Sequence, residues 1–487
     1  MDAPARGSST AAASWNGALL VLALTVALRM WDLGNPVIHV AEQYYLLIGD
    51  RMLHGAVPYL DVWDRKPIGL FLLYAAMRLL PGNGILAYQL CAAAAAWLTA
   101  LLVRRGACRV GASEAGALAA AAAYLFGLAL LGGRGGQAPV FYNLPMAAAG
   151  LLTLELPALA QRDAGGRIVA NGAIACLLAG LAIQMKYTPA VEGAFFGAAH
   201  CWFLRRASKR WTTIMGAATL WVLLGLVPTL AAAAWFARAG ALHAFWFANF
   251  TSIGMRAGYP LDQLAMRLLG IAAILSPLAA GAWLAWRGRS REACVGYGWL
   301  AAAVIGFLAI GTFFDHYALP LLAPLAIAAS PALGRLPRLR AGTLGLALLL
   351  FVVERATAPR DGAGARTVAQ VVAANSQGGC PYVFIGDTMT YYLAHACLPT
   401  AYAFPNLLAY TTEQGATGID EAAEVRRILA HRPPVIVTSD RRLSIWNAGS
   451  LRAVKAALTA DYRLVFTTPR SGWRTAVYLR RDLPLRR

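Results

Sequence analysis

The sequence feature that most limits the possible folds of this chain is a series of long apolar runs, separated by short clusters of arginine. Most runs contain about 17 to 25 residues, which is the length of a helix that crosses roughly 30 Å of hydrocarbon. Only 14% of the residues are Asp, Glu, Lys or Arg, whereas soluble domains contain roughly 25%. The chain is therefore expected to be a polytopic α-helical membrane protein, and an ordinary soluble enzyme is excluded.

Eleven membrane-spanning helices are predicted from the apolar runs. The last run is too short to cross a membrane, so we expect its helix to begin earlier. Because the number is odd, the two ends of the chain should lie on opposite sides of the membrane. The predicted spans cover residues 14–30, 85–103, 115–131, 144–159, 168–185, 189–204, 214–236, 266–286, 294–311, 317–333 and 343–353.

The net charge is +20, and 15 of the 43 Lys and Arg residues lie in clusters that recur at every second gap between the runs. This distribution follows the positive-inside rule, under which Lys and Arg mark cytoplasmic loops. A nucleic-acid site needs its cations on one face, so no nucleic-acid partner is expected. We predict a multi-pass protein of a bacterial inner (plasma) membrane with a cytoplasmic N-terminus. The clusters are Arg104, Arg105 and Arg109; Arg162 and Arg167; Arg205, Arg206, Lys209 and Arg210; Arg287, Arg289 and Arg291; and Arg335, Arg338 and Arg340.

Two stretches of the sequence do not fit inside the membrane. The first is an outer loop over 31–80, whose segments 42–53 and 68–80 have the helical spacing and single apolar face of interfacial helices. The second is 358–487, where short β-branched runs alternate with helical ones. We expect a transmembrane catalytic domain over 1–357 and a small periplasmic or extracytoplasmic α/β domain after it. Its expected strands cover 382–385, 435–438, 464–467 and 476–479, and its expected helices cover 421–431 and 451–459.

Two of the seven cysteines, Cys380 and Cys397, lie in the predicted outer domain. A disulfide between them is one interpretation if that compartment is oxidising, because such compartments preserve disulfides. The spacing alone does not decide the pairing. The other cysteines lie in or beside the apolar runs, where a small apolar side chain explains them. No Cys/His spacing indicates a zinc site, so no metal ligands are predicted.

The first outer loop contains the densest group of acids and cations in the chain. Glu42 is followed within thirty residues by Asp61, Asp64, Arg65 and Lys66. A carboxylate can act as a general base, and a pair of cations can bind a phosphate. The alternative is that these charges only cap interfacial helices and meet lipid headgroups.

Four outer segments carry a resemblance to a known family. The first loop ends in Pro58-Tyr59-Leu60-Asp61-Val62-Trp63-Asp64-Arg65-Lys66-Pro67. The others are Gln184-Met185-Lys186-Tyr187-Thr188-Pro189, Phe245-Trp246-Phe247-Ala248-Asn249-Phe250 and Phe314-Asp315-His316-Tyr317-Ala318-Leu319-Pro320. Together with the predicted spans and the α/β tail, they resemble the polyprenyl-phosphate-sugar-dependent glycosyltransferases of the C superfamily (GT-C). The most similar branches are the family 39 enzymes, which include protein O-mannosyltransferases and the aminoarabinose transferase of lipid A.

The resemblance implies an enzyme that moves a hexosyl or pentosyl group from a polyprenyl-phosphate donor to a lipid, glycan or protein acceptor on the outer face of the membrane. In the family, an Asp-Glu pair stands early in the first loop, and its Asp is the base that deprotonates the acceptor. The corresponding pair here is Ala41-Glu42. Either Glu42 is the base, or Asp61 or Asp64 takes that role, or the chain is inactive; we favour Glu42.

The phosphate that leaves the sugar gains negative charge and needs cations around it. Lys186 stands at the end of an apolar helix, where the alternative is that it snorkels to the interface. Because the donor is already activated, no cofactor is required, although the acidic loop could hold a divalent cation. The candidate phosphate ligands are Arg65, Lys66, Arg134, Lys186, Arg256 and His316.

Two other functions fit a chain with this many predicted spans. A polytopic transporter would be expected to show internal repeats and ionisable residues in the middle of spans. The sequence has no such repeat, and its ionisable residues gather outside the predicted spans. A non-catalytic membrane scaffold is the other alternative, because the family's Asp is replaced by Ala41.

Overall fold

The computed structural model describes residues 7–208, 210–441 and 445–486, so Lys209 of the third arginine cluster lies outside the described residues. The chain divides into two compact units. We call the first the membrane unit; it consists of Met1–Leu33, Gln89–Ala231 and Leu261–Ala356. We call the second the loop–tail unit; it consists of Gly34–Tyr88, Ala232–Pro260 and Thr357–Arg487.

Each of the eleven predicted spans overlaps a helical segment. In the described part of the chain, eight helices are long and apolar enough to cross a membrane, and the protein is a multi-pass membrane protein. The count of eleven spans stays a prediction. The helices that overlap the eleven predicted spans are α1 (Gly7–Arg29), α4 (Gly84–Arg109), α5 (Glu114–Leu130), α6 (Ala138–Leu154), α7 (Leu156–Gln161), α8 (Gly165–Ile183), α9 (Pro189–Ser208), α10 (Trp211–Arg238), α13 (Leu261–Ala285), α14 (Arg291–Ile310), α15 (Leu322–Arg335) and α16 (Pro337–Thr357). As expected, the last helix begins before the short apolar run.

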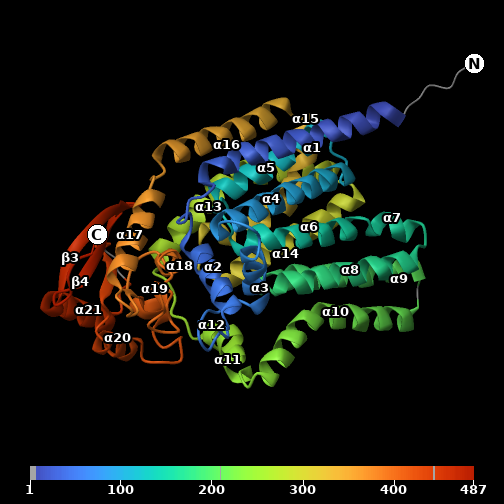
Figure 1. Cartoon of the computed structure of the whole chain (residues 1–487). Helices are drawn as coiled ribbons and strands as arrows, with labels where there is room; N and C mark the ends of the chain where they lie inside the picture. Colours follow the sequence, from blue (N-terminus) through green and yellow to red (C-terminus); the bar gives the residue numbers. More distant parts are fainter. Residues whose placement is uncertain (1–6, 209, 442–444, 487) are drawn as a thin grey trace, which may run out of the picture. The chain divides into compact units, whose positions relative to one another are not determined.

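Small residues allow the helices of the membrane unit to approach closely. Helix α15 contacts both α5 and α13, and α8 packs against α6 and α9 (Figure 1). A Cβ atom at Gly116 of α5 would lie only 2.4 Å from the carbonyl oxygen of Ser330 in α15. A Cβ atom at Gly180 of α8 would lie 2.5 Å from the carbonyl oxygen of Gly225 in α10. In lipid the hydrophobic effect does not drive helix association. Close van der Waals packing of this kind therefore stabilises the contacts between these helices.

The loop–tail unit contains a four-stranded sheet, as the sequence predicts. The strands have the order β1-β2-β4-β3, with β1 parallel to β2 and the other two pairs antiparallel. They are β1 (Tyr382–Val383), β2 (Val435–Ser439), β3 (Tyr462–Arg470) and β4 (Trp473–Arg480), and the last two form the red hairpin of Figure 1. The predicted tail helices are α20 (Glu421–Ala430) and α21 (Ala448–Asp461). The other helices of the unit are α2 (Val40–Leu53), α3 (Ile68–Arg78), α11 (Leu242–Trp246), α12 (Ser252–Gly254), α17 (Gly362–Asn375), α18 (Met389–Leu393) and α19 (Pro405–Ala409).

Side chains that cap helices and one apolar core stabilise the fold of the tail of this unit. Asp420 accepts a hydrogen bond from the Ala423 amide at the start of α20, and Asn447 accepts from the Ser450 amide at the start of α21. Such caps satisfy backbone donors that the first helical turn leaves without partners. The buried core of the tail contains Tyr382, Phe384, Val425, Ile428, Ile436 and Val454.

Helix α2 differs from its predicted form. Its sequence spacing predicts one apolar face, but every residue from Glu42 to Gly49 is buried. The polar residues Glu42 and Gln43 are tolerated there because their side chains have hydrogen-bond partners. The spacing of apolar residues cannot predict such partners, because they come from distant parts of the chain.

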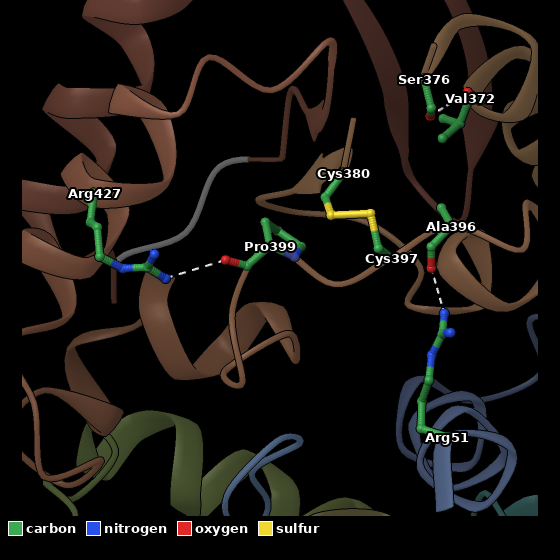
Figure 2. The surroundings of a disulfide bond; sticks show 8 residues. All are labelled: Arg51, Val372, Ser376, Cys380, Ala396, Cys397, Pro399 and Arg427. Atoms are coloured by element: carbon green, nitrogen blue, oxygen red, sulfur yellow. Dashed lines mark hydrogen bonds between the residues drawn. A yellow bond between two sulfur atoms is a disulfide. The ribbon is translucent and has the colours of Figure 1, made fainter. Parts of the chain in front are cut away.

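A disulfide joins Cys380 and Cys397 in the tail (Figure 2). The residue before Cys397 is Ala396, whose carbonyl oxygen accepts a hydrogen bond from the Arg51 guanidinium near the end of α2 (Figure 2). The disulfide therefore constrains the loop that binds the C-terminal end of α2.

We expect loss of this disulfide to destabilise the protein. The two cysteines are 17 residues apart, and closing a loop of about 15 residues stabilises a fold by about 3 kcal/mol in the chain-entropy description. The double variant Cys380→Ser, Cys397→Ser should melt at a lower temperature than the wild type, as followed by intrinsic fluorescence of the purified protein. A reductant should lower the melting temperature of the wild type and leave the double variant unchanged. An equal effect of reductant on both proteins would show that the effect does not come from this disulfide.

Candidate active site

The favoured base, Glu42, lies in the first turn of α2. The helix begins after His39, whose imidazole Nδ1 accepts a hydrogen bond from the Ala41 amide at 3.3 Å. A carboxylate in a first helical turn is stabilised by the helix dipole. Glu42 has an exposed fraction of 0%, and its Oε1 accepts a hydrogen bond from the Tyr88 hydroxyl at 3.2 Å. The ring of Tyr74 lies beside that of Tyr88, with 5.4 Å between the ring centroids. The carboxylate is thus held in a dry aromatic environment.

The two alternative bases follow in the loop after α2. Asp61 is exposed, and its Oδ2 accepts a hydrogen bond from the Val57 amide at 2.7 Å, which closes a tight turn. Asp64 is half-buried, and its Oδ1 accepts from the amide of the next residue at 2.5 Å. The Tyr44 hydroxyl donates to the Trp63 carbonyl oxygen at 3.0 Å, so the Asp64 segment packs against α2. Burial, assisted by the charge of Asp64, raises the pKa of Tyr44 well above its ordinary value.

Two of the predicted phosphate ligands meet at one buried acid of the tail. Arg65 forms an ion pair with Glu413, and the Arg256 guanidinium lies 2.7 Å from the other carboxylate oxygen of Glu413. Arg65 also donates to the Ser252 hydroxyl at 3.0 Å and to the Ala416 carbonyl oxygen at 2.9 Å. Burial lowers the pKa of the Arg65 guanidinium, and the charge of Glu413 opposes that shift. Arg65 therefore joins the first loop to the tail, through Glu413 and Ala416, and to α12, through Ser252.

Lys66 differs from its neighbour. Its ammonium group forms no ion pair within the described residues, although the side chain is half-buried. The Lys66 carbonyl oxygen accepts a hydrogen bond from the Tyr59 hydroxyl at 2.8 Å, which fixes the backbone at this position. Tyr59 itself has a positive φ of 71° and packs on Phe236 and Phe245. The charge of Lys66 is therefore not neutralised by an ion pair within the described part of the chain.

Arg134, a candidate of the membrane unit, belongs to a network of charges. Its guanidinium lies 3.4 Å from Asp32 and 3.4 Å from Glu354. Burial raises the pKa of the Asp32 carboxyl, and the charges of Arg134 and Arg29 oppose this. Arg29 donates to the carbonyl oxygens of Gly133 and Arg134, at 2.8 and 3.1 Å. The loop Gly132-Gly133-Arg134-Gly135-Gly136 therefore directs backbone oxygen atoms toward the Arg29 cation.

The last two candidates of the membrane unit are brought together by an aromatic ring. The Lys186 ammonium lies 3.5 Å from the centroid of the Tyr317 ring, which is a cation–π contact. The ring centroids of His316 and Tyr317 are 4.6 Å apart. Lys186 follows α8, whereas His316 lies in a short 3-10 helix (Asp315–Tyr317) before α15. Two segments that are far apart in the sequence thus form one cationic and aromatic group.

The residues that sequence reasoning missed are mainly the partners of the predicted ones. Tyr88 stands inside an apolar helix, and Glu413 stands in a tail segment without a recognisable motif. Nothing local marks either residue, because their contacts join positions 46 and 348 residues apart. Within the part of the chain that the structure describes, no group of three or more His, Cys, Asp and Glu side chains could hold a metal ion.

The comparisons with known proteins agree with this architecture. No protein-family model matches the sequence, and no curated protein matches it. Among solved structures, ArnT from Cupriavidus metallidurans bound to undecaprenyl phosphate superposes with a TM-score of 0.63 at 14% identity, covering 97% of this chain and 98% of that one. Its apo structure gives 0.64 at 15% identity, covering 96% and 98%. The oligosaccharyltransferase AglB from Archaeoglobus fulgidus, with an inhibitory peptide and a dolichol-phosphate, gives 0.51 at 12% identity, covering 97% and 75%. The chain therefore shares the fold of ArnT along nearly its whole length and, with lower similarity, that of AglB.

Proposed function

We propose that this protein transfers a sugar from a polyprenyl-phosphate donor to an acceptor on the outer face of the membrane. One observation carries the proposal: the fold is shared along nearly the whole chain with ArnT, which was solved with bound undecaprenyl phosphate. The acid and cation of the first loop, Glu42 and Lys66, support the same chemistry. A hexosyl or pentosyl group and a lipid, glycan or protein acceptor are within this proposal.

The proposed reaction needs a base and a cation. The acceptor oxygen attacks the anomeric carbon, the bond from that carbon to the phosphate oxygen breaks, and the electron pair leaves on the phosphate. Glu42 takes the acceptor proton, with Asp61 and Asp64 as the alternative carboxylates. The phosphate changes from a diester with one negative charge to a monoester with about two, so a nearby cation stabilises the transition state more than the bound donor. The activated donor makes a cofactor unnecessary.

Six cations are proposed for the donor phosphate, and their contacts rank them. Lys66 stands first, because it has no ion pair in the described part of the chain. Arg65 and Arg256 both pair with Glu413, whose negative charge partly cancels theirs, so each would stabilise the phosphate less than Lys66. Lys186, His316 and Arg134 are the candidates of the membrane unit. We place the reaction at the periplasmic face of a bacterial inner membrane, with the N-terminus in the cytoplasm.

A turnover assay tests the proposal. The full-length protein, purified in detergent, is incubated with a polyprenyl-phosphate hexose or pentose and an extract of membrane lipids, glycans and proteins. We expect polyprenyl phosphate to be released and the labelled sugar to appear on one acceptor class. Donor binding without release would point to a scaffold. Movement of the intact donor across vesicles, without cleavage, would point to a transporter.

A further inference from the structure

A buried network in the loop–tail unit ties the β3–β4 hairpin to the start of the first loop. Arg470, the last residue of β3, donates to both carboxylate oxygens of Asp387, at 2.8 and 2.9 Å. It also forms an ion pair with Asp361 and donates to the Val37 carbonyl oxygen at 3.1 Å. All three charged residues are less than a tenth exposed. Such a bidentate, charge-assisted arrangement is among the strongest and most directional that proteins form.

Asp361 pairs with Arg470 and does not make the capping hydrogen bond that is usual at its position. It occupies the N-cap position of α17, where an aspartate normally accepts a hydrogen bond from the first turn. Its side chain makes no such bond, and the carboxylate is directed to Arg470 instead. The tail therefore orients Arg470 from two sides, through Asp361 and Asp387.

The network continues into α2 through the residue next to the proposed base. The side-chain amide of Gln43 donates to Asp387 Oδ1 at 2.9 Å, and its carbonyl oxygen accepts from the Met389 amide at 3.3 Å. Gln43 is completely buried, so both of its polar groups depend on the tail. Val37 lies before the first turn of α2 and Gln43 lies within it. Arg470 and Asp387 thus bind the chain on both sides of Glu42.

We propose that Gln43, Asp387 and Arg470 are positioning residues that hold the first turn of α2, and with it the Glu42 carboxylate, in the geometry needed for proton removal. This inference rests on the proposed function, since it assigns the network a role in that same site. None of the three side chains takes part in the chemistry itself. A displacement of about 1 Å in a reacting group reduces the rate by about 10²-fold.

Gln43→Leu tests this role without breaking the ion pairs. Asp387 keeps both hydrogen bonds to Arg470 in this variant, so the tail should fold. We expect kcat to fall about 10²-fold with the donor KM changed less than about twofold. Hydrogen exchange of the amides of residues 40–46 should become about 10-fold faster.

Arg427→Gln is the matched control. Arg427 pairs with Glu424 at 2.6 Å in the same unit, and none of its hydrogen bonds reaches α2. We expect this variant to leave both kcat and exchange at 40–46 unchanged. A purely structural role would lower the yield of folded Gln43→Leu protein and leave kcat per folded molecule unchanged, which would overturn the proposal. If the wild type proves inactive, the proposed function fails, and unchanged exchange at 40–46 in Gln43→Leu would independently refute the holding role.

Discussion

Replacing Glu42 with glutamine should lower kcat for sugar transfer by roughly 10²- to 10⁴-fold, which is the contribution typical of a general base. Glutamine keeps the shape and can still accept the hydrogen bond from the Tyr88 hydroxyl. It cannot take a proton from the acceptor. Release of polyprenyl phosphate from a labelled donor measures the effect, with gel filtration to verify that the variant is folded.

Tyr88→Phe separates the carboxylate from its hydrogen-bond partner. This variant keeps Glu42 ionisable and removes only the phenolic hydroxyl, so we expect a loss of less than about 10-fold. Full activity of Glu42→Gln would remove Glu42 from the mechanism. The role of base would then pass to Asp64 or Asp61, and Asp64→Asn and Asp61→Asn would identify which of them carries it.

Replacing Lys66 with methionine should lower kcat/KM by roughly 10²- to 10³-fold, the effect of removing one group that stabilises a developing oxyanion. Methionine fills a similar volume and has no charge. Since the phosphate gains charge as the sugar leaves, we expect the loss to appear mainly in kcat rather than in KM. Initial rates at varied donor concentration, at two salt concentrations, measure both constants.

The chain provides a matched control for the charge of Lys66. Lys455 is an exposed lysine on α21, and Lys455→Met changes the net charge by the same amount. We expect that variant to retain wild-type kcat and KM. Equal losses in the two variants would show that the Lys66 effect is one of overall charge, and the cation for the phosphate would then be sought among Lys186, His316 and Arg256.

The secondary structure of this chain is largely predictable because its signals are local. The strand expected over 435–438 is β2, and the helix expected over 451–459 lies within α21. Helix α17 also carries a readable signal, since Ala365, Val368, Ala369 and Val372 repeat at helical spacing and are buried. Their small size makes the pattern weak, so the helix is easily overlooked.

The contacts of the candidate site are not predictable in the same way. Lys66 and Arg65 are adjacent and read alike in the sequence, yet only Arg65 is neutralised by Glu413. Arg134 is one of the predicted phosphate ligands, whereas in the structure its guanidinium pairs with Asp32 and its own carbonyl oxygen binds Arg29. These outcomes depend on which distant segment supplies the partner, and no pattern within a short window contains that information.

The link between Gln43 and Asp387 has a consequence for biosynthesis. The two residues are separated by 344 positions, and a ribosome that adds 5 to 20 residues per second needs roughly 20 to 70 s to cover that distance. During this time α2 has been synthesised, but Asp387, which accepts the hydrogen bond of the buried Gln43 side chain, has not. The first turn of α2 therefore lacks this partner until residue 387 has been synthesised. A chain that stops before residue 387 would leave the Gln43 side chain without its hydrogen-bond partners, Asp387 and the Met389 amide.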